Sequence, residues 1–370
     1  MKFAHFLVLP LSLAVLTACP KPADDKIAHL HYGQMATETY EAIDYQSLSE
    51  KVENKETFLV SVYAEGCTCW STFQTVLSQY IKETHVIVYA IGYKAFHSTT
   101  GETLDNFGLK LKSGYTSFAI FKDGKPLVDV NSEKKELKEY EPFKKMMDAS
   151  VTLPKIFYIS KDQVDQLYGS NETSLLYFAR SNCQDCQYFD RNLLDSYETS
   201  KNIYILDCEK IGIRVYDETG THLTPESQVA WNKFKEDYGL ASTNNPDYGY
   251  DTGYVPSLFL LHGNGDAEHP SPTFLQGSVY FNDSVEMVGD ELKVTSSYYT
   301  TERAAKLEYL SGIETTVLKD MTLSPSDVDA ITFGENTYYF WKQDAAARYH
   351  TPLAKAFLDY SVQRVTHTGF

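Results

Sequence analysis

The clearest chemistry in this sequence is carried by two closely spaced cysteines, Cys183 and Cys186. They follow an apolar run at 174–179 that is bounded by polar residues, which predicts a buried strand. After Cys183 the apolar residues recur at helical spacing, so we expect a helix that begins at this cysteine. The two thiols would then lie where a strand ends and a helix starts.

A thiol at the start of a helix is activated by its position. It faces unpaired backbone N–H groups and the positive end of the helix dipole, and both favour the thiolate that acts as nucleophile in disulfide exchange. Cys186 lies one helical turn on, close enough to displace a mixed disulfide formed at Cys183. The pattern therefore predicts a thiol–disulfide redox site. The alternative is a structural disulfide, because exported proteins carry many inert bridges.

Composition and charge limit the classes of function. The apolar share of 43% and the aromatic share of 14% are typical of packed globular structure, and 370 residues leave room for two domains and an appendage. A net charge of −17 disfavours nucleic acid as a partner. No glycine-rich phosphate loop follows a predicted strand, so we predict no nucleotide and no other cofactor.

The first 19 residues have the features of an export signal. Lys2 supplies a positive charge, and the apolar stretch at 6–16 is too short to span a bilayer. It closes on Leu-Thr-Ala-Cys19, which resembles the lipobox of bacterial lipoproteins, where the cysteine becomes lipidated. A secretory signal with an incidental cysteine is the alternative. We predict a signal peptide at 1–19, a tether at 20–35, and an extracytoplasmic protein held to the bacterial cell membrane by lipid on Cys19.

Export changes how the remaining cysteines are interpreted. Besides Cys183 and Cys186 there are the pair Cys67 and Cys69 and the single Cys208. This odd set favours two local pairs over a long-range disulfide framework, and Cys208 is expected to be a buried, inert thiol. No histidine pair stands at zinc-finger spacing from either pair, so no metal site is predicted there.

The order of predicted elements occurs twice. Cys67 and Cys183 occupy equivalent points about 116 residues apart, each after an apolar strand and before a helix. The matching strands are 58–63 with 174–179, 85–89 with 202–206, and 114–121 with 253–261. An internal duplication of a βαβ-rich domain is the simplest explanation. We place the two domains at 36–150 and 155–300.

Both halves of the sequence resemble a known family. Each half resembles a thioredoxin fold, and Tyr-Phe-Ala-Arg-Ser-Asn-Cys183-Gln-Asp-Cys186 is similar to the thioredoxin-like bacteriocin-transport accessory proteins of Gram-positive bacteria. The resemblance implies an α/β fold with two thioredoxin-like domains in tandem. It also implies that Cys183 attacks, that Cys186 resolves, and that a cis Val255–Pro256 peptide faces them and offers its backbone to the substrate.

The sequence departs from the thioredoxin pattern near the cysteines. Asn182 stands where a tryptophan usually precedes the first cysteine. The buried acid of the central strand has no counterpart, because Leu176 or Tyr177 occupies its place. Asp185 and Asp190 add negative charge that opposes a thiolate.

The first half departs further from the thioredoxin pattern than the second half does. Cys67-Thr-Cys69 has one residue between the thiols, so a disulfide there would be strained and easily reduced. By match, Thr116 replaces the proline opposite the pair. We favour a degenerate domain kept for packing or partner binding over an active secondary redox site. Capture of Cu(I) by the two soft thiolates is a weaker alternative.

Residues 301–370 are predicted to be a helical extension of the second domain, with one helix starting at Ser324. Its first helix would complete that domain. The resulting functional hypothesis is a membrane-anchored thiol–disulfide oxidoreductase that acts on secreted or surface proteins, with a membrane redox partner or an exporter as further candidate partners. The alternatives are a non-catalytic binding protein for peptide export and a copper carrier.

Overall fold

The computed structural model describes residues 26–35, 37–96, 103–109, 114–218, 222–240, 255–281, 283–313 and 317–370. The predicted signal peptide and Cys19 lie outside these ranges. Within them, no helix is both long enough and apolar enough to cross a bilayer.

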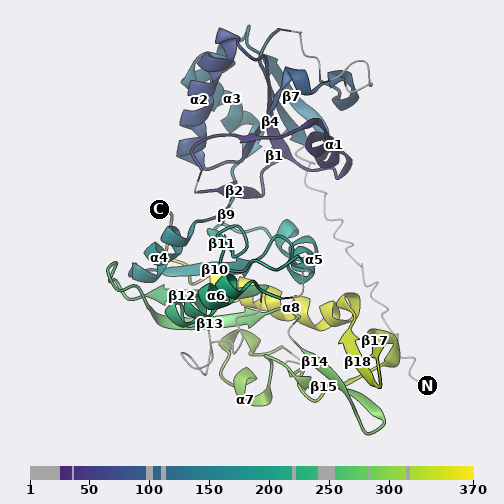
Figure 1. Cartoon of the computed structure of the whole chain (residues 1–370). Coiled ribbons are helices and arrows are strands. Elements are labelled where there is room, and N and C mark those ends of the chain that lie inside the picture. Colours follow the sequence, from purple (N-terminus) through teal and green to yellow (C-terminus); the bar gives the residue numbers. More distant parts are fainter. Residues whose placement is uncertain are drawn as a thin grey trace, which may run out of the picture.

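The first unit, at 37–150, is built on a sheet with the strand order β3-β5-β4-β6-β7. Its strands are β3 (Glu41–Ala42), β4 (Phe58–Tyr63), β5 (Val88–Gly92), β6 (Ser117–Lys122) and β7 (Lys125–Asn131). Helices α2 (Thr68–Thr84) and α3 (Tyr140–Ser150) cover one face of this sheet, and α1 (Tyr45–Glu53) covers the other (Figure 1). The central strand β4 is mostly apolar because both of its faces are buried, and its one buried hydroxyl, on Ser61, donates a hydrogen bond to the Ser117 carbonyl oxygen.

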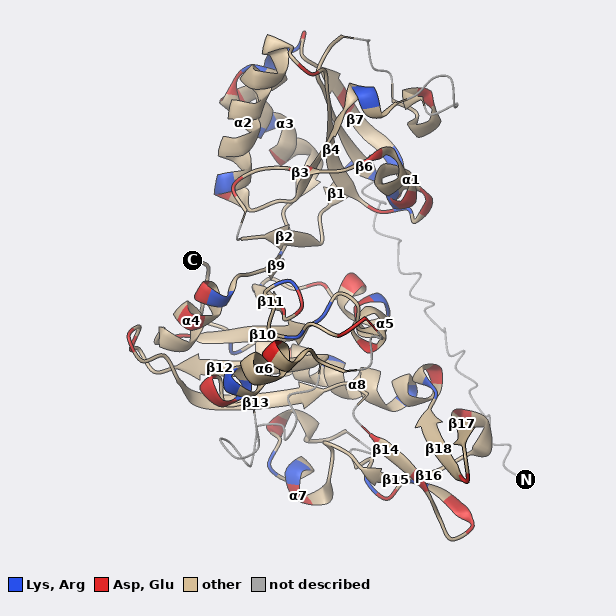
Figure 2. Ribbon diagram, viewed as in Figure 1, with Lys and Arg blue, Asp and Glu red and all other residues tan. Residues whose placement is uncertain are grey.

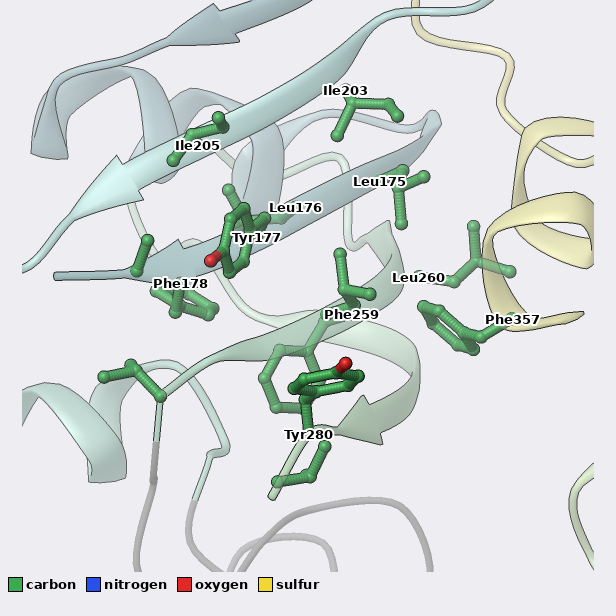
Figure 3. Close-up of a cluster of buried hydrophobic side chains, with 14 of the residues drawn as sticks. Leu175, Leu176, Tyr177, Phe178, Ile203, Ile205, Phe259, Leu260, Tyr280 and Phe357 are labelled. Atoms are coloured by element: carbon green, nitrogen blue, oxygen red, sulfur yellow. The ribbon is translucent and has the colours of Figure 1, made fainter. Parts of the chain in front are cut away.

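The second unit, at 155–281 with 343–370, contains a sheet with the order β13-β12-β10-β11-β9-β2. Its own strands are β9 (Ile156–Tyr158), β10 (Thr173–Ala179), β11 (Ile203–Asp207), β12 (Ser257–Gly263) and β13 (Pro272–Val279). Its helices are α4 (Lys161–Gly169), α5 (Gln184–Asn192), α6 (Pro225–Asp237) and α8 (Gln343–Val362). Figure 3 shows the apolar side chains that β10, β11 and β12 contribute to its core.

The two sheets repeat one topology. Numbered along each unit, the strands lie in the order 1-3-2-4-5, with the second parallel to the third and antiparallel to the fourth. The repeat predicted from the spacing of the cysteines is therefore present in the strand order.

The N-terminal segment differs from the prediction. Residues 28–34 are not a tether but two strands: β1 (Ala28–His29) pairs with β8 (Val151–Thr152), and β2 (Tyr32–Gln34) pairs with β9. Gly33 passes between the units, where an added Cβ would lie 2.6 Å from the Phe157 ring and 2.7 Å from the His85 carbonyl oxygen. Only glycine lets the chain run so close to both units.

The predicted helical extension at 301–370 is wrong over most of its length. The chain there completes an inserted sheet with the order β16-β15-β14-β18-β17, formed by β14 (Ser284–Val288), β15 (Glu291–Ser296), β16 (Thr322–Leu323), β17 (Val328–Phe333) and β18 (Asn336–Trp341). Ser324 precedes only a 3₁₀ turn at Pro325–Asp327. The reason is that β17 and β18 are joined by a tight turn at Gly334, whose φ of +64° suits glycine, and that aromatic residues favour strands.

The helix that completes the second unit is also different from the predicted one. The first helix of the extension, α7 (Thr301–Ala304), is a single short turn with no buried residue. The final helix α8 instead places Leu353, Phe357 and Leu358 in the main core, and Figure 3 shows Phe357 beside Leu260 of β12. The inserted sheet is therefore a long insertion in the chain between β13 and α8, the helix that completes the second unit.

Candidate functional site

The start of α5 is fixed by the first cysteine itself. Strand β10 ends at Ala179, and Cys183 is the N-cap of α5, where its Sγ accepts a hydrogen bond from the Cys186 backbone N–H at 3.3 Å. A sulfur in this position satisfies one of the backbone N–H groups that a helix start leaves unpaired. The prediction that a helix begins at Cys183 is confirmed.

The pKa values of the two thiols in this pair are shifted in opposite directions. Hydrogen bonds from the Cys186 thiol and backbone N–H lower the pKa of Cys183 to about 7, although burial acts against them. Burial raises the pKa of Cys186 well above that of an ordinary thiol. Both are free thiols in this structure. Near neutral pH, Cys183 is therefore the residue of the pair that supplies a thiolate.

The cis proline lies where the resemblance placed it. The Val255–Pro256 peptide is cis, and the Val255 carbonyl oxygen lies 3.7 Å from Cys183 Sγ. Cys183 keeps 7% of its surface exposed and Cys186 keeps 2%. The structure thus brings together the four residues predicted for this site, and the opening over the attacking sulfur is narrow.

The sequence identified Asp190 only as a negative charge that opposes a thiolate, whereas the structure places it as a partly buried acid near the thiols. Tyr177 of β10 is fully buried, and its hydroxyl donates a hydrogen bond to Asp190 Oδ1 at 3.1 Å (Tyr177 is labelled in Figure 3). Burial raises the pKa of Asp190 to about 7, and the Cys183 charge acts in the same direction. The acid comes from α5 instead of the central strand. Its spacing of four residues from Cys186 was the available signal, because such residues share one helix face.

The Asp190 carboxyl makes stability depend on pH. Its pKa is about 7 in the folded protein, whereas an aspartate in an unfolded chain titrates near about 4. Between these values only the unfolded state releases the proton, so stability falls as pH rises from about 4 to about 7 and stays lower above. Asp190→Asn should therefore raise the free energy of unfolding by about 1–3 kcal/mol at about pH 8 and change it little at about pH 4.

Urea unfolding in a Trp70→Phe background measures this effect, because Trp231 and Trp341 then report on the second unit and the sheet inserted in it. Asp148→Asn, on the exposed side of α3 in the first unit, is the matched control and should leave stability within about 0.5 kcal/mol at both pH values. An equal gain from Asp190→Asn at both pH values would contradict the prediction.

The cysteine pair of the first unit is arranged differently. Cys67 and Cys69 form a disulfide, and Cys67 is the N-cap of α2. The fully buried Thr116 faces this pair, with its Oγ1 3.4 Å from Cys69 Sγ. Thr116 thus occupies the place assigned to it. The described part of the chain contains no group of three or more His, Cys, Asp or Glu side chains able to hold a metal ion.

Cys208 is separate from both pairs. It is fully buried just after β11, and burial raises the pKa of its thiol to about 12. A thiol with so high a pKa supplies almost no thiolate at neutral pH. These features agree with the prediction of an inert thiol.

Comparison with known proteins finds only distant similarity. No protein-family model and no curated protein matches the sequence. Among solved structures, form II of human ERp44 has a TM-score of 0.28 at 11% identity, covering 63% of this chain and 53% of that protein. A mutant thioredoxin from Halobacterium salinarum has a TM-score of 0.24 at 17% identity, covering 33% and 100%. Thioredoxin f2 of Chlamydomonas reinhardtii has a TM-score of 0.23 at 13% identity, covering 30% and 94%.

These neighbours are thioredoxin-fold proteins, matched weakly and over part of the chain, which spans about half the length of ERp44. Likeness at this level does not bear on function, and the description of the fold rests on strand order and connections. The finer resemblance to bacteriocin-transport accessory proteins has no support from a family model or a curated sequence and stays a prediction.

Proposed function

We propose that this protein is a tandem thioredoxin-like thiol–disulfide oxidoreductase whose second unit acts on secreted or surface proteins. The main support is one observation: within a single helical turn, the pKa of Cys183 is lowered to about 7 while that of Cys186 is raised, and Cys183 faces the carbonyl oxygen of the cis Val255–Pro256 peptide. An inert structural bridge does not require this contrast between its two thiols.

The proposed reaction proceeds in two exchanges. The Cys183 thiolate attacks one sulfur of a substrate disulfide, a new S–S bond forms, and the other substrate sulfur leaves as a thiolate. Cys186 then loses its proton and attacks the Cys183 sulfur, which breaks the mixed disulfide and releases the second substrate thiolate. Two electrons have passed to the substrate, and Cys183 and Cys186 are joined. The reverse sequence oxidises a dithiol substrate.

Asp190 is our candidate for the group that accepts the Cys186 proton. Its charge acts on Cys186, and its pKa of about 7 allows it to hold or release a proton near neutral pH. The positive charge of Arg180, whose guanidinium lies over the Tyr216 ring, lowers the pKa of Cys183 and so favours the thiolate.

The cellular setting forms part of the same proposal. The lipobox-like sequence that ends in Cys19 supports export and lipid anchoring to the bacterial cell membrane. The first unit, with its bonded Cys67–Cys69 pair and Thr116 in place of a proline, would serve as a partner-binding module. A membrane redox protein or an exporter is the expected upstream partner.

A non-catalytic binding protein is the second candidate. The low exposure of Cys183, 7% of its surface, favours this alternative, because a redox centre must be reached by its substrate. A glutathione redox series combined with alkylation at graded pH separates the two functions.

For the oxidoreductase we expect the pair to pass from dithiol to disulfide within the series, and alkylation of Cys183 to reach half its maximal rate near pH 7. Cys183→Ser should remove the fast alkylation, and Cys208→Ala should leave it unchanged. A pair that stays oxidised throughout, or a half-maximal rate above about pH 8.5, would overturn the proposal in favour of the binding protein.

A further inference from the structure

A groove runs beside the helix that carries the cysteines. It has a volume of about 1280 Å³ and lies between the first turns of α5, the inserted sheet and the start of α8. Gln184, Asp185 and Tyr188 line it from α5, and Tyr338 and Phe340 line it from β18. Gln184 directly follows Cys183 in the chain, so one end of the groove lies at the residue next to the first cysteine.

Tyr338 and Phe340, on the far wall of the groove, belong to an exposed apolar face that Ile331 and Phe333 extend beyond the groove. Ile331 lies opposite Tyr338 in the β17–β18 register and Phe340 lies two residues on, so these side chains share one face of the hairpin. Ile331, Phe333, Tyr338 and Phe340 are between 53% and 80% exposed. Several large apolar side chains exposed together mark a surface that binds another molecule.

Hydrogen bonds hold this face in a fixed position relative to the cysteines. The Gln343 side chain donates to Asp185 Oδ1 at 2.7 Å, and the Tyr188 hydroxyl donates to Asp344. Both bonds join α5 to the start of α8, which directly follows β18. A chain lying on the hairpin face would therefore be guided toward the start of α5.

The charge of the groove identifies its occupant. Its exposed and half-buried acidic residues outnumber its basic ones: Asp185, Glu286, Asp327, Asp329 and Asp344 against Arg191, Lys342 and Arg348, with Asp283 left out because it is buried and paired with His350. Lys342 and Arg348 are already paired with Asp329 and Asp327 (Figure 2 colours the charged residues of the inserted sheet). With a net charge of −17 on each chain, a second copy is repelled, whereas a cationic segment is attracted.

We propose that this groove binds an extended segment of the substrate protein that combines apolar side chains with Lys or Arg, and that it delivers the neighbouring disulfide to Cys183. The inference rests on the proposed function and specifies its substrate class. An extended segment also suits the low exposure of Cys183, which keeps 7% of its surface accessible.

The test uses the full chain and two synthetic peptides. One alternates Lys and Leu around a central cysteine that is blocked as its glutathione mixed disulfide; the other has Glu in place of Lys. We expect the basic peptide to exchange about tenfold faster than the acidic one, and Tyr338→Ser/Phe340→Ser to slow the basic peptide about tenfold. Val229→Ser, which truncates a side chain on α6 that is 71% exposed, is the matched control and should change neither rate.

Oxidised glutathione separates the two hypotheses. If it fails to exchange with the wild-type protein, the proposed function is wrong. If it exchanges equally with all variants while the double variant keeps the wild-type rate with the basic peptide, the groove assignment is overturned.

Fluorescence anisotropy of the basic peptide on Cys183→Ser protein measures binding without chemistry. Glu286→Lys should weaken that binding about tenfold and strengthen binding of the acidic peptide. Because Glu286 is exposed, Glu286→Lys should fold normally. It therefore tests the groove even if the Tyr338→Ser/Phe340→Ser protein folds poorly. Unchanged affinities for both peptides would overturn the inference.

Discussion

Cys186→Ser should turn the protein into a trap that accumulates a mixed disulfide between Cys183 and its substrate, whereas Cys183→Ser should form none. Turnover should fall on the order of a thousandfold or more in both variants, because a serine hydroxyl neither attacks nor resolves a disulfide at neutral pH. Trapping should be efficient, because a serine at position 186 can still donate a hydrogen bond to the Cys183 sulfur. That bond is the main cause of the lowered pKa of Cys183.

Cys186→Ala supplies the matched comparison. It removes the side-chain donor, so the pKa of Cys183 should rise above about 7 and the mixed disulfide should form more slowly than with Cys186→Ser. Non-reducing electrophoresis and mass spectrometry of the covalent complex measure both effects, and Cys208→Ser serves as a neutral control. Covalent complexes that form equally well with Cys183→Ser would show that another thiol attacks.

His350→Ala should lower the free energy of unfolding of the second unit by about 3–5 kcal/mol. His350 of α8 and Asp283, which lies where the chain leaves β13 for the inserted sheet, form a buried pair. Their Nε2 and Oδ2 atoms are 2.5 Å apart, and the two side chains are 1% and 3% exposed. Removing the histidine leaves a buried carboxyl group without its partner, which is the costly way to break such a pair.

The double variant His350→Leu/Asp283→Leu tests this reason. Because apolar residues of similar size often replace a buried pair at little cost, the double variant should recover most of the stability lost in His350→Ala. Urea unfolding with Trp231 and Trp341 as probes measures both variants. If the double variant is as unstable as His350→Ala, the stabilising contribution of His350 comes from the packing of its ring against Tyr280 and Phe281 and not from its pairing with Asp283.

The redox pair is formed by residues close together in the sequence, whereas the His350–Asp283 pair joins residues far apart in the sequence. The helix start at Cys183, the activation of its thiol and the repeat that includes Cys67 could be predicted, because they depend on neighbouring residues and on patterns that recur along the sequence. The cis Val255–Pro256 peptide could be placed by resemblance, because only proline adopts that geometry readily.

The prediction of a helical extension at 301–370 failed for a physical reason. The register of β14 against β18 joins Val285 to Tyr339, and the core position of Phe357 depends on β12, both far away in sequence. Short apolar runs such as 338–341 fit a strand or a buried helix equally well until their partners are known. Propensity alone did not show that these residues would complete a sheet.

The sequence by itself determined the redox motif, the duplicated strand order and the burial of Cys208, because apolar periodicity and cysteine spacing are local properties. Only the tertiary structure decided that Asp190 lies partly buried near the thiols, that α8 closes the second unit, and that an acidic, aromatic groove starts at Gln184, next to Cys183. Each of these depends on contacts between segments that are brought together only when burial of apolar surface repays the entropy of ordering the chain.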